Sequence, residues 1–255
     1  MRISNSIVIN NNPTAALGGG SPFTNAYSTL FDGVDEYADC GDIGGTLDNA
    51  STVSYSFWVK PLVSGSEYFL GWFAVGNSAF YVNIDVNERI KAYVTDGTTA
   101  ISMESASINV ITINSWQHVA VVYDASQTPD VNSVKFYVDG SQETSSVKSG
   151  SKPSDVGTLS NNLFLGATST TANANCYLDE VAVFDYALSS GEVTSIYNSG
   201  APNNLMDLAA AKQPEHYYRM GDNDTFPTIT DNGATGGNNG TMTNMESGDF
   251  TTDVI

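Results

Sequence analysis

Three acidic side chains occupy positions where they could bind a cation. Asp32 and Asp35 belong to an Asp-Gly-x-Asp sequence that is typical of a turn, and Asp179 precedes Val181 and Val183 in an apolar run. Alternation along a strand predicts that Asp179 shares the inward face of the two valines. A buried carboxylate needs a partner, because burying an isolated charge costs too much free energy. The partner is either a divalent cation or a set of backbone N–H groups, and the two turn residues can equally form Asx-turns.

Aromatic side chains offer a second kind of chemistry, the binding of sugar rings. Trp72, Phe73, Tyr81 and Tyr93 occur in segments with strand character, and the loop Ser169–Asn175 is polar. Aromatic faces pack on apolar surfaces while polar neighbours form hydrogen bonds, which is what a glycan requires. The alternative is that these aromatic residues belong to the core. The sequence therefore leaves glycan binding open.

The charge balance excludes two classes of partner. The chain of 255 residues has 9 Lys and Arg against 28 Asp and Glu, which gives a net charge of −19. Only 15% of the residues are charged, against about 25% in an average soluble protein, so the imbalance is mainly a shortage of bases. Polyanions are repelled by such a field, so we expect neither nucleic-acid binding nor docking to an anionic membrane.

Short segments with a period of two residues dominate the middle of the chain. In residues 54–60, Tyr55, Phe57 and Val59 alternate with Ser56 and Lys60, the pattern of a half-buried antiparallel strand. Many short strands separated by turn residues predict an all-β sandwich. Further candidate strands are residues 68–73, 80–85, 90–95, 118–124, 134–139, 162–167 and 177–184, with fragments at 217–220 and 241–245.

Helices are expected at only two places. Ser189 and Glu192 have the spacing of a capping box, which predicts a short helix that begins at Ser189 and runs through residue 198. A second short helix fits residues 204–212. Cys40 and Cys176 are the only cysteines, and we expect buried thiols rather than a bridge. Neither a signal peptide nor a membrane span is predicted. The predicted organisation is an N-terminal arm at 1–26, one jelly roll at 27–200 and a C-terminal extension at 201–255 that packs on the sandwich.

A series of short sequence motifs resembles the pattern of a known family. The chain is similar to the laminin G-like, pentraxin-like branch of the concanavalin A-like lectin/glucanase superfamily, which implies a two-sheet antiparallel jelly-roll sandwich with one or two short helices. The motifs are LFDGVDEY (30–37), SFWVKP (56–61), WQHVAVVYD (116–124), VKFYVDG (134–140), LGA (165–167), LDEVAVF (178–184) and ALS (187–189) leading to Glu192.

The resemblance has implications for metal binding and catalysis. Many such domains hold Ca²⁺ with carboxylate and backbone oxygens, which makes Asp32, Asp35 and Asp179 the candidate calcium ligands. Glucanases of the superfamily place paired carboxylates on one strand face in a Glu-x-Asp-x-x-Glu run. This chain has no Glu-x-Asp, and alternation places Asp179 and Glu180 on opposite faces. We therefore expect no enzymatic activity, and we expect His118 to be structural.

The end of the chain resembles a narrower group. Residues 217–222 (YYRMGD), 229–232 (ITDN) and 240–245 (GTMTNM) are similar to the ending of laminin G-like proteins of tailed bacteriophages. The resemblance implies a virion structural protein, a capsid decoration or cement protein that oligomerises and binds the capsid surface. Such a protein would lie on the virion surface. The alternative is a carbohydrate-binding adhesion module of a tail fibre or cell surface, which would be extracellular and have glycans as partners.

Overall fold

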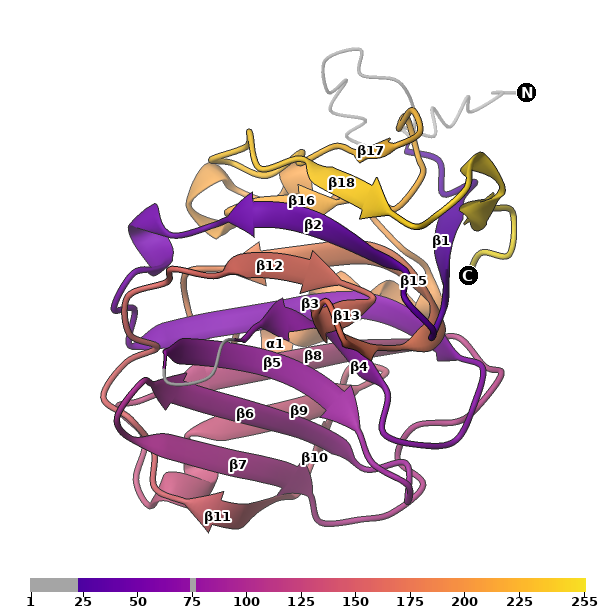
Figure 1. The fold of residues 1–255 in the computed structure, drawn as a ribbon. Coiled ribbons are helices and arrows are strands. Elements are labelled where there is room, and N and C mark those ends of the chain that lie inside the picture. Colours follow the sequence, from indigo (N-terminus) through magenta and orange to yellow (C-terminus); the bar gives the residue numbers. More distant parts are fainter. Residues whose placement is uncertain (1–22, 74–76) are drawn as a thin grey trace, which may run out of the picture.

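Two antiparallel sheets lie face to face in the computed structural model, which describes residues 23–73 and 77–255 (Figure 1). In spatial order the back sheet contains β10 (Ser141–Glu143), β9 (Val134–Val138), β8 (Gln117–Asp124), β3 (Thr52–Pro61), β15 (Asn175–Phe184), β1 (Ser28–Asp32) and β19 (Phe250–Thr251), and β16 (His216–Tyr218) pairs with β15. The front sheet contains β11 (Ser145–Gly150), β7 (Ala100–Ser105), β6 (Ile90–Asp96), β5 (Ser78–Ile84), β4 (Tyr68–Trp72), β12 (Asn162–Leu165), β2 (Tyr37–Asp42), β18 (Gly240–Thr243) and β17 (Thr228–Ile229). The predicted all-β, two-sheet sandwich is confirmed.

Alternating side chains fill the space between the sheets. On β3, Tyr55, Phe57 and Val59 are buried in the central core, as their alternation in the sequence predicts. Ser56 and Trp58 project to the other side of the back sheet. Each large apolar side chain that is fully buried contributes about 1.5–3 kcal/mol to the free energy of folding. The core is therefore a direct consequence of the period-two pattern.

Both cysteines lie in this core as free thiols. Cys40 is on β2 of the front sheet and Cys176 is on β15 of the back sheet. Burial raises the pKa of each thiol, so neither is a reactive thiolate at neutral pH. The prediction that they do not form a disulfide is confirmed.

The outer side of the back sheet is covered by a second apolar cluster. Helix α1 (Ser190–Tyr197) contributes Val193 and Ile196, which pack with Phe184 and Tyr217 of the sheet. The helix predicted over 204–212 is wrong. Two short 3-10 turns, η4 (Leu205–Asp207) and η5 (Ala210–Lys212), replace it, because Leu208 between them has extended backbone. Other 3-10 turns are η1 (Gly45–Leu47), η2 (Asp130–Asn132), η3 (Asn198–Gly200) and η6 (Ser247–Asp249).

The start of α1 supports a quantitative prediction. Ser189 Oγ accepts a hydrogen bond from the Glu192 backbone N–H, and the Glu192 carboxylate accepts one from the Ser189 N–H. Replacing Ser189 with alanine is expected to lower the free energy of unfolding by about 1 kcal/mol, the usual value of an N-cap. Urea denaturation measures this loss, and the adjacent Ser190→Ala variant should leave stability unchanged. Equal effects of the two substitutions would contradict the capping role.

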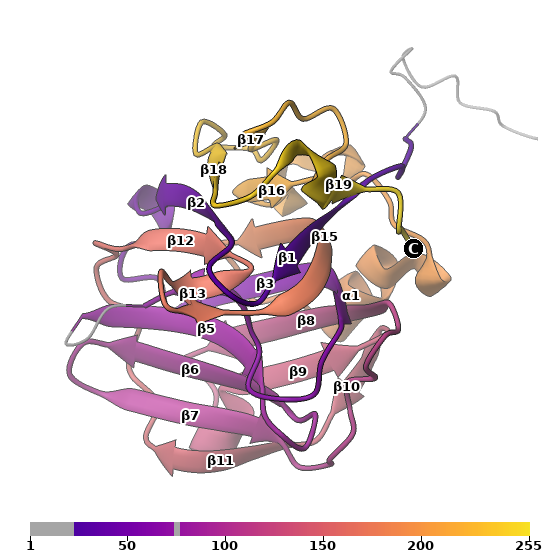
Figure 2. The ribbon, with the colours of Figure 1, turned by 45° about the vertical axis from the view of Figure 1, so that its right-hand side comes forward.

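The C-terminal region adds strands to both sheets. β16 pairs with β15 and β19 pairs with β1 in the back sheet, while β18 pairs with β2 in the front sheet. Figure 2 shows these late strands together at one end of the sandwich. Of the predicted N-terminal arm, only residues 23–26 fall in the described part of the chain. Among the described residues, no helix is long and apolar enough to cross a membrane.

Candidate functional site

The outer face of the front sheet carries an aromatic row that crosses several strands. The register places Tyr93 of β6 opposite Tyr81 of β5, Tyr81 opposite Gly71 of β4, and Gly71 opposite Phe164 of β12. We call Tyr93, Tyr81 and Phe164 the aromatic row. Their neighbours in sequence point into the core, so strand alternation sends these three side chains outward. In Figure 1 no helix of the described part of the chain covers this face of the sheet.

Further rings widen the aromatic row. The Tyr81 and Tyr93 rings stack with centroids 5.3 Å apart and an interplanar angle of 27°. Tyr68 and Phe73 lie 5.8 and 5.6 Å from the Tyr81 ring, and all four side chains are half-buried. Burial, with Tyr68 and Tyr93 nearby, raises the pKa of Tyr81 to about 12, so its hydroxyl stays a hydrogen-bond donor at neutral pH. The result is a rigid apolar surface with phenol groups at its edge.

A glycine separates the two ends of the aromatic row. Gly71 lies between Tyr81 and Phe164, which are two strand spacings, or about 10 Å, apart. A Cβ at this position would lie 2.4 Å from Tyr81 Cα, and the backbone has φ +139°. Any other residue would therefore be strained here. The sheet surface between these two aromatic side chains therefore carries no side chain and lies lower than its surroundings.

At the β7 end of this face, acidic and basic side chains partly neutralise each other. Glu104 of β7 forms ion pairs with Arg89 at 3.2 Å and with Lys148 at 3.7 Å. The row itself continues into uncharged Ser102 on one side of Tyr93. The aromatic surface thus offers packing and hydroxyl groups rather than a strong charge.

The aromatic residues that the sequence offers for glycan contact differ in burial. Trp72 is fully buried in the core, so the prediction that it is available is wrong, because it lies between outward Gly71 on β4 and outward Phe73, which follows the strand. Phe73, Tyr81 and Tyr93 do lie on the outer face. The predicted polar loop 169–175 includes part of a small hairpin of β13 (Ala167–Ser169) and β14 (Ala172–Asn173).

Sequence reasoning missed Tyr37, Tyr68 and Phe164. The Tyr37 and Phe164 rings meet edge to face at 5.4 Å on neighbouring strands. The outward direction of Phe164 could be predicted from the local sequence, because it alternates with buried Leu163 and Leu165. Strand pairing brings these side chains onto one surface, and the local sequence does not predict that pairing.

The structure does not gather the three candidate calcium ligands. Asp32 and Asp35 are exposed at the β1–β2 turn, and Asp32 Oδ1 accepts the Val34 N–H at 2.8 Å, the predicted Asx-turn alternative. Asp32 is opposite Asn175, four residues before Asp179 on β15. In residues 23–73 and 77–255, no three His, Cys, Asp or Glu side chains form a group that could hold a metal ion. Calcium binding by this chain stays a prediction.

A β-bulge reverses the predicted direction of Asp179. Glu180 has a left-handed backbone (φ +49°), and the register of β15 against β3 shifts by one residue between Asp179 and Ala182. Val181 and Val183 remain in the central core, whereas Asp179 pairs with Trp58 on the outer side. The expectation of an inward Asp179 is therefore wrong. The expectation that Asp179 and Glu180 lie on opposite faces is also wrong, because the extra residue at the bulge turns both acids outward.

This acid pair is closed off by the chain itself. Asp179 is 0% exposed and Glu180 is 4% exposed, and among the described residues neither carboxylate oxygen of Asp179 has a hydrogen-bond partner. Glu180 accepts hydrogen bonds from Tyr217 and, at 3.1 Å, from the guanidinium of Arg219. Burial raises the pKa of Asp179 well above its usual range and that of Glu180 to about 7. The pair lies in the interior and offers no carboxylate to a sugar.

Residues 23–27 cover this acid cluster. Arg219 Nη2 donates to Thr24 O at 2.6 Å and to Asp222 at 3.1 Å, and its guanidinium lies 4.4 Å from the centre of the Phe23 ring. The Ala26 N–H donates to the Asp222 carboxylate at 3.1 Å. Arg219 therefore pairs with the carboxyl groups of Glu180 and Asp222 under the N-terminal segment, whereas Asp179 receives no ion pair from it.

His118 belongs to the packing of the back sheet. Its Nε2 atom is 2.8 Å from Ser56 Oγ, and burial lowers its pKa to about 3. The ring is neutral at any ordinary pH and packs against Trp58 with centroids 5.3 Å apart. This environment suits the structural role predicted for it.

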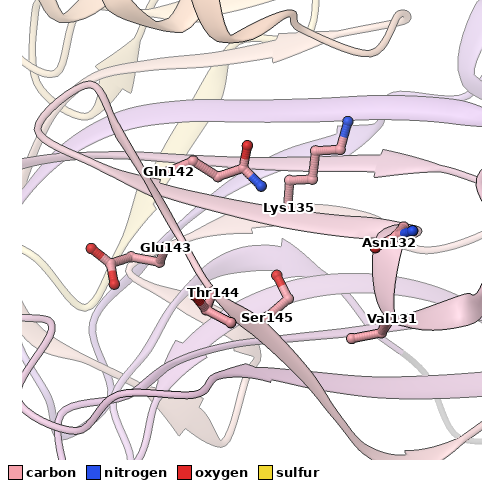
Figure 3. A pocket seen from close by; sticks show the side chains of 7 residues that line it. All are labelled: Val131, Asn132, Lys135, Gln142, Glu143, Thr144 and Ser145. Atoms are coloured by element: carbon pink, nitrogen blue, oxygen red, sulfur yellow. The ribbon is translucent and has the colours of Figure 1, made fainter.

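A separate hollow lies at the free edges of β10 and β11. It has a volume of about 380 Å³ and is lined by Val131, Asn132, Lys135, Gln142, Glu143, Thr144 and Ser145 (Figure 3). Figure 3 shows Lys135 and Gln142 on one side, with the Glu143 carboxylate pointing away from Lys135. The hollow lacks an aromatic wall, so it offers no stacking surface for a sugar ring.

Comparisons with known proteins agree with this architecture. Residues 32–194 match the laminin G-like family model of the concanavalin A-like lectin/glucanases superfamily. No curated protein matches the sequence. A Bacteroides ovatus protein proposed to bind carbohydrate has a TM-score of 0.57 at 18% identity, over 87% of this chain and 59% of its own.

Two further solved structures have a TM-score of 0.50. The heptameric SAP-like pentraxin of Limulus polyphemus is 11% identical, over 68% of this chain and 82% of its own. The CBM40 of Ruminococcus gnavus IT-sialidase, bound to alpha2,3 sialyllactose, is 13% identical, over 67% of this chain and 96% of its own. At these identities the likeness concerns the fold, and the predicted virion and capsid role stays a prediction. Because the family model covers well over half of its residues, the chain belongs to the concanavalin A-like lectin/glucanases superfamily.

Proposed function

We propose that this protein is a carbohydrate-binding module and that the outer face of the front sheet is its glycan site. The observation that carries the proposal is the aromatic row, in which half-buried rings from distant parts of the sequence share an uncovered sheet face. Tyr and Phe rings pack against apolar surfaces at low entropic cost, and tyrosine hydroxyls add hydrogen bonds. This combination suits the apolar faces and hydroxyl edges of sugar rings.

The structurally similar proteins support the same class of function. The Bacteroides ovatus protein is itself proposed to bind carbohydrate, and the CBM40 structure contains a bound sialyllactose. A sandwich offers such modules a flat, rigid sheet whose side chains are fixed by strand pairing. The closed acid pair at Asp179 and Glu180 supports binding rather than hydrolysis as the role of this fold here.

Removing one ring should test the proposal. Tyr81 contacts Tyr68, Phe73 and Tyr93, so Tyr81→Ala removes the centre of the aromatic surface. We expect about tenfold weaker glycan binding, which corresponds to about 1.4 kcal/mol for a lost aromatic contact. A glycan array identifies the ligand, and titration calorimetry then compares the wild type with the variant.

The matched control is Tyr81→Phe, which keeps the ring and loses only the hydroxyl. This variant should retain most of the affinity, and the melting temperatures of both variants should show that each is folded. A wild-type protein that binds no glycan on the array would refute the proposed function. Unchanged affinity in Tyr81→Ala would place the site elsewhere.

A further inference from the structure

A polar hollow adjoins the Phe164 end of the aromatic row. Phe164 pairs with Asp39 on β2, and Asp39 pairs with Thr241 on β18, so the three side chains share one line across the sheet. The hollow beside them has a volume of about 520 Å³. Its lining consists of Asp39, Cys40, Gly41, Asn162, Gly237, Asn238, Asn239, Thr241 and Thr243.

The Asp39 carboxylate is held in a fixed orientation. Its Oδ1 atom accepts the Gly41 N–H and its Oδ2 atom accepts Asn162 Nδ2, each at 2.9 Å. A carboxylate oxygen has more than one lone-pair direction, so both atoms can accept another hydrogen bond. Asp39 can therefore accept two neighbouring hydroxyl groups at once without moving.

The opposite wall of the hollow is also fixed. Asn238 Nδ2 donates to Asp42 O at 2.7 Å and to Cys40 O at 3.4 Å, and Asn238 O accepts the Tyr218 hydroxyl at 2.9 Å. The Asn238 side chain is therefore held in place before any ligand arrives. A preorganised polar site loses little conformational entropy on binding.

The charge of the hollow selects among saccharides. Among the residues that the structure describes, Asp39 is the only charged one in the lining, and no Lys or Arg lines the hollow. A lone carboxylate attracts hydroxyl donors and repels the carboxylates of uronic or sialic acids. The sialyllactose in the CBM40 structure carries such a negative charge, so the ligand expected here is of a different class.

We propose that the Asp39 hollow is a subsite that binds a neutral hexose through two adjacent hydroxyl groups while Phe164 packs on the ring. This inference rests on the proposed function, because it extends the same sheet face. The aromatic row then packs against the remaining sugar units of the glycan chain, and Asp39 determines which sugar occupies the hollow.

Affinity electrophoresis distinguishes this subsite from the site as a whole. Native gels containing a neutral glucan, mannan or galactan, or the anionic polygalacturonate, are run with the wild type and three variants. The variants are Asp39→Asn, Tyr81→Ala and, as a matched control, Asp42→Asn, which keeps the backbone carbonyl that accepts Asn238 and changes only a carboxylate outside the lining that accepts the Gly44 N–H. Melting temperatures confirm folding.

We expect at least one neutral polysaccharide to retard the wild type, and polygalacturonate to leave it unretarded. Asp39→Asn should weaken binding about tenfold, because hydrogen bonds to a charged acceptor are lost, whereas Asp42→Asn should bind like the wild type. Full binding by Asp39→Asn with loss in Tyr81→Ala would overturn the subsite and leave the proposed function intact. Stronger retardation by polygalacturonate would overturn the neutral class, and no retardation by any polymer would overturn both proposals.

Discussion

Replacing Arg219 with methionine is expected to destabilise the fold by about 3–5 kcal/mol, the usual cost of leaving buried charge unpaired. Arg219 is the cation that contacts both Glu180 and Asp222, each at 3.1 Å, and those two carboxylates are nearly inaccessible to water. Methionine keeps the length and apolar surface of the side chain. The loss therefore reports on charge, and urea denaturation at pH 7 measures it.

A surface ion pair provides the control for this substitution. Lys60 pairs with Asp253 at 2.7 Å, but the Asp253 side chain is 37% exposed. Lys60→Met should cost less than about 1 kcal/mol, because exposed pairs are screened by water and salt. Adding Glu180→Gln to Arg219→Met should restore part of the stability. Similar losses for the two single variants would contradict the buried cluster described here.

Replacing Asp179 with asparagine is expected to stabilise the protein by about 1–3 kcal/mol at pH 8, the range found for buried unpaired polar groups. Burial, with Glu180 and Asp222 nearby, raises the pKa of Asp179 well above its usual range. Within residues 23–73 and 77–255, neither of its oxygens has a hydrogen-bond partner, and the buried Asn25 amide beside it also lacks one. An asparagine carries no charge and can pair with that amide.

The expected gain depends on pH in a definite direction. A carboxyl group with a raised pKa in the folded state holds its proton more tightly there than in the unfolded chain. The free energy of unfolding therefore falls as the pH rises from the unfolded pKa, about 3.9 for aspartate, toward the folded pKa. Glu180, with a folded pKa of about 7, contributes in the same direction. Asp179→Asn should match the wild type near pH 4 and exceed it increasingly toward pH 8.

Melting temperatures between pH 4 and pH 8 measure this difference. Asp35→Asn is a suitable control, since Asp35 is exposed at the β1–β2 turn. That variant should follow the wild type at every pH. A lower melting temperature for Asp179→Asn across the whole range would mean that the ionised carboxylate stabilises the fold, and would refute this account of the cluster.

Much of the fold could be predicted because burial leaves a local pattern. The alternation of Tyr55, Phe57 and Val59 predicted their place in the core, and the Ser189 to Glu192 spacing predicted the start of α1. Strands β7 and β11 escaped prediction. The weak apolar pattern of β11, a largely exposed edge strand, is the physical reason for its omission, whereas β7 does alternate, with Ile101 and Met103 buried.

The direction of Asp179 shows where alternation fails. A single left-handed residue, Glu180, inserts a bulge and shifts every later side chain of β15 relative to the earlier ones. Glutamate has no special preference for this backbone, unlike glycine or asparagine. The bulge is therefore stabilised by tertiary contacts, among them the bonds of Glu180 to Tyr217 and Arg219.

The candidate site likewise combines features that follow from the local sequence with features that depend on the tertiary structure. The sequence by itself determined that the chain forms an antiparallel sandwich, whereas it left open whether Trp72, Phe73, Tyr81 and Tyr93 are exposed or belong to the core. Only the tertiary structure decided that Tyr81, Phe164 and Asp39 share one line across the front sheet. Side-chain direction follows from the local period of a strand, whereas the register between strands distant in sequence is set by the packing of the whole core.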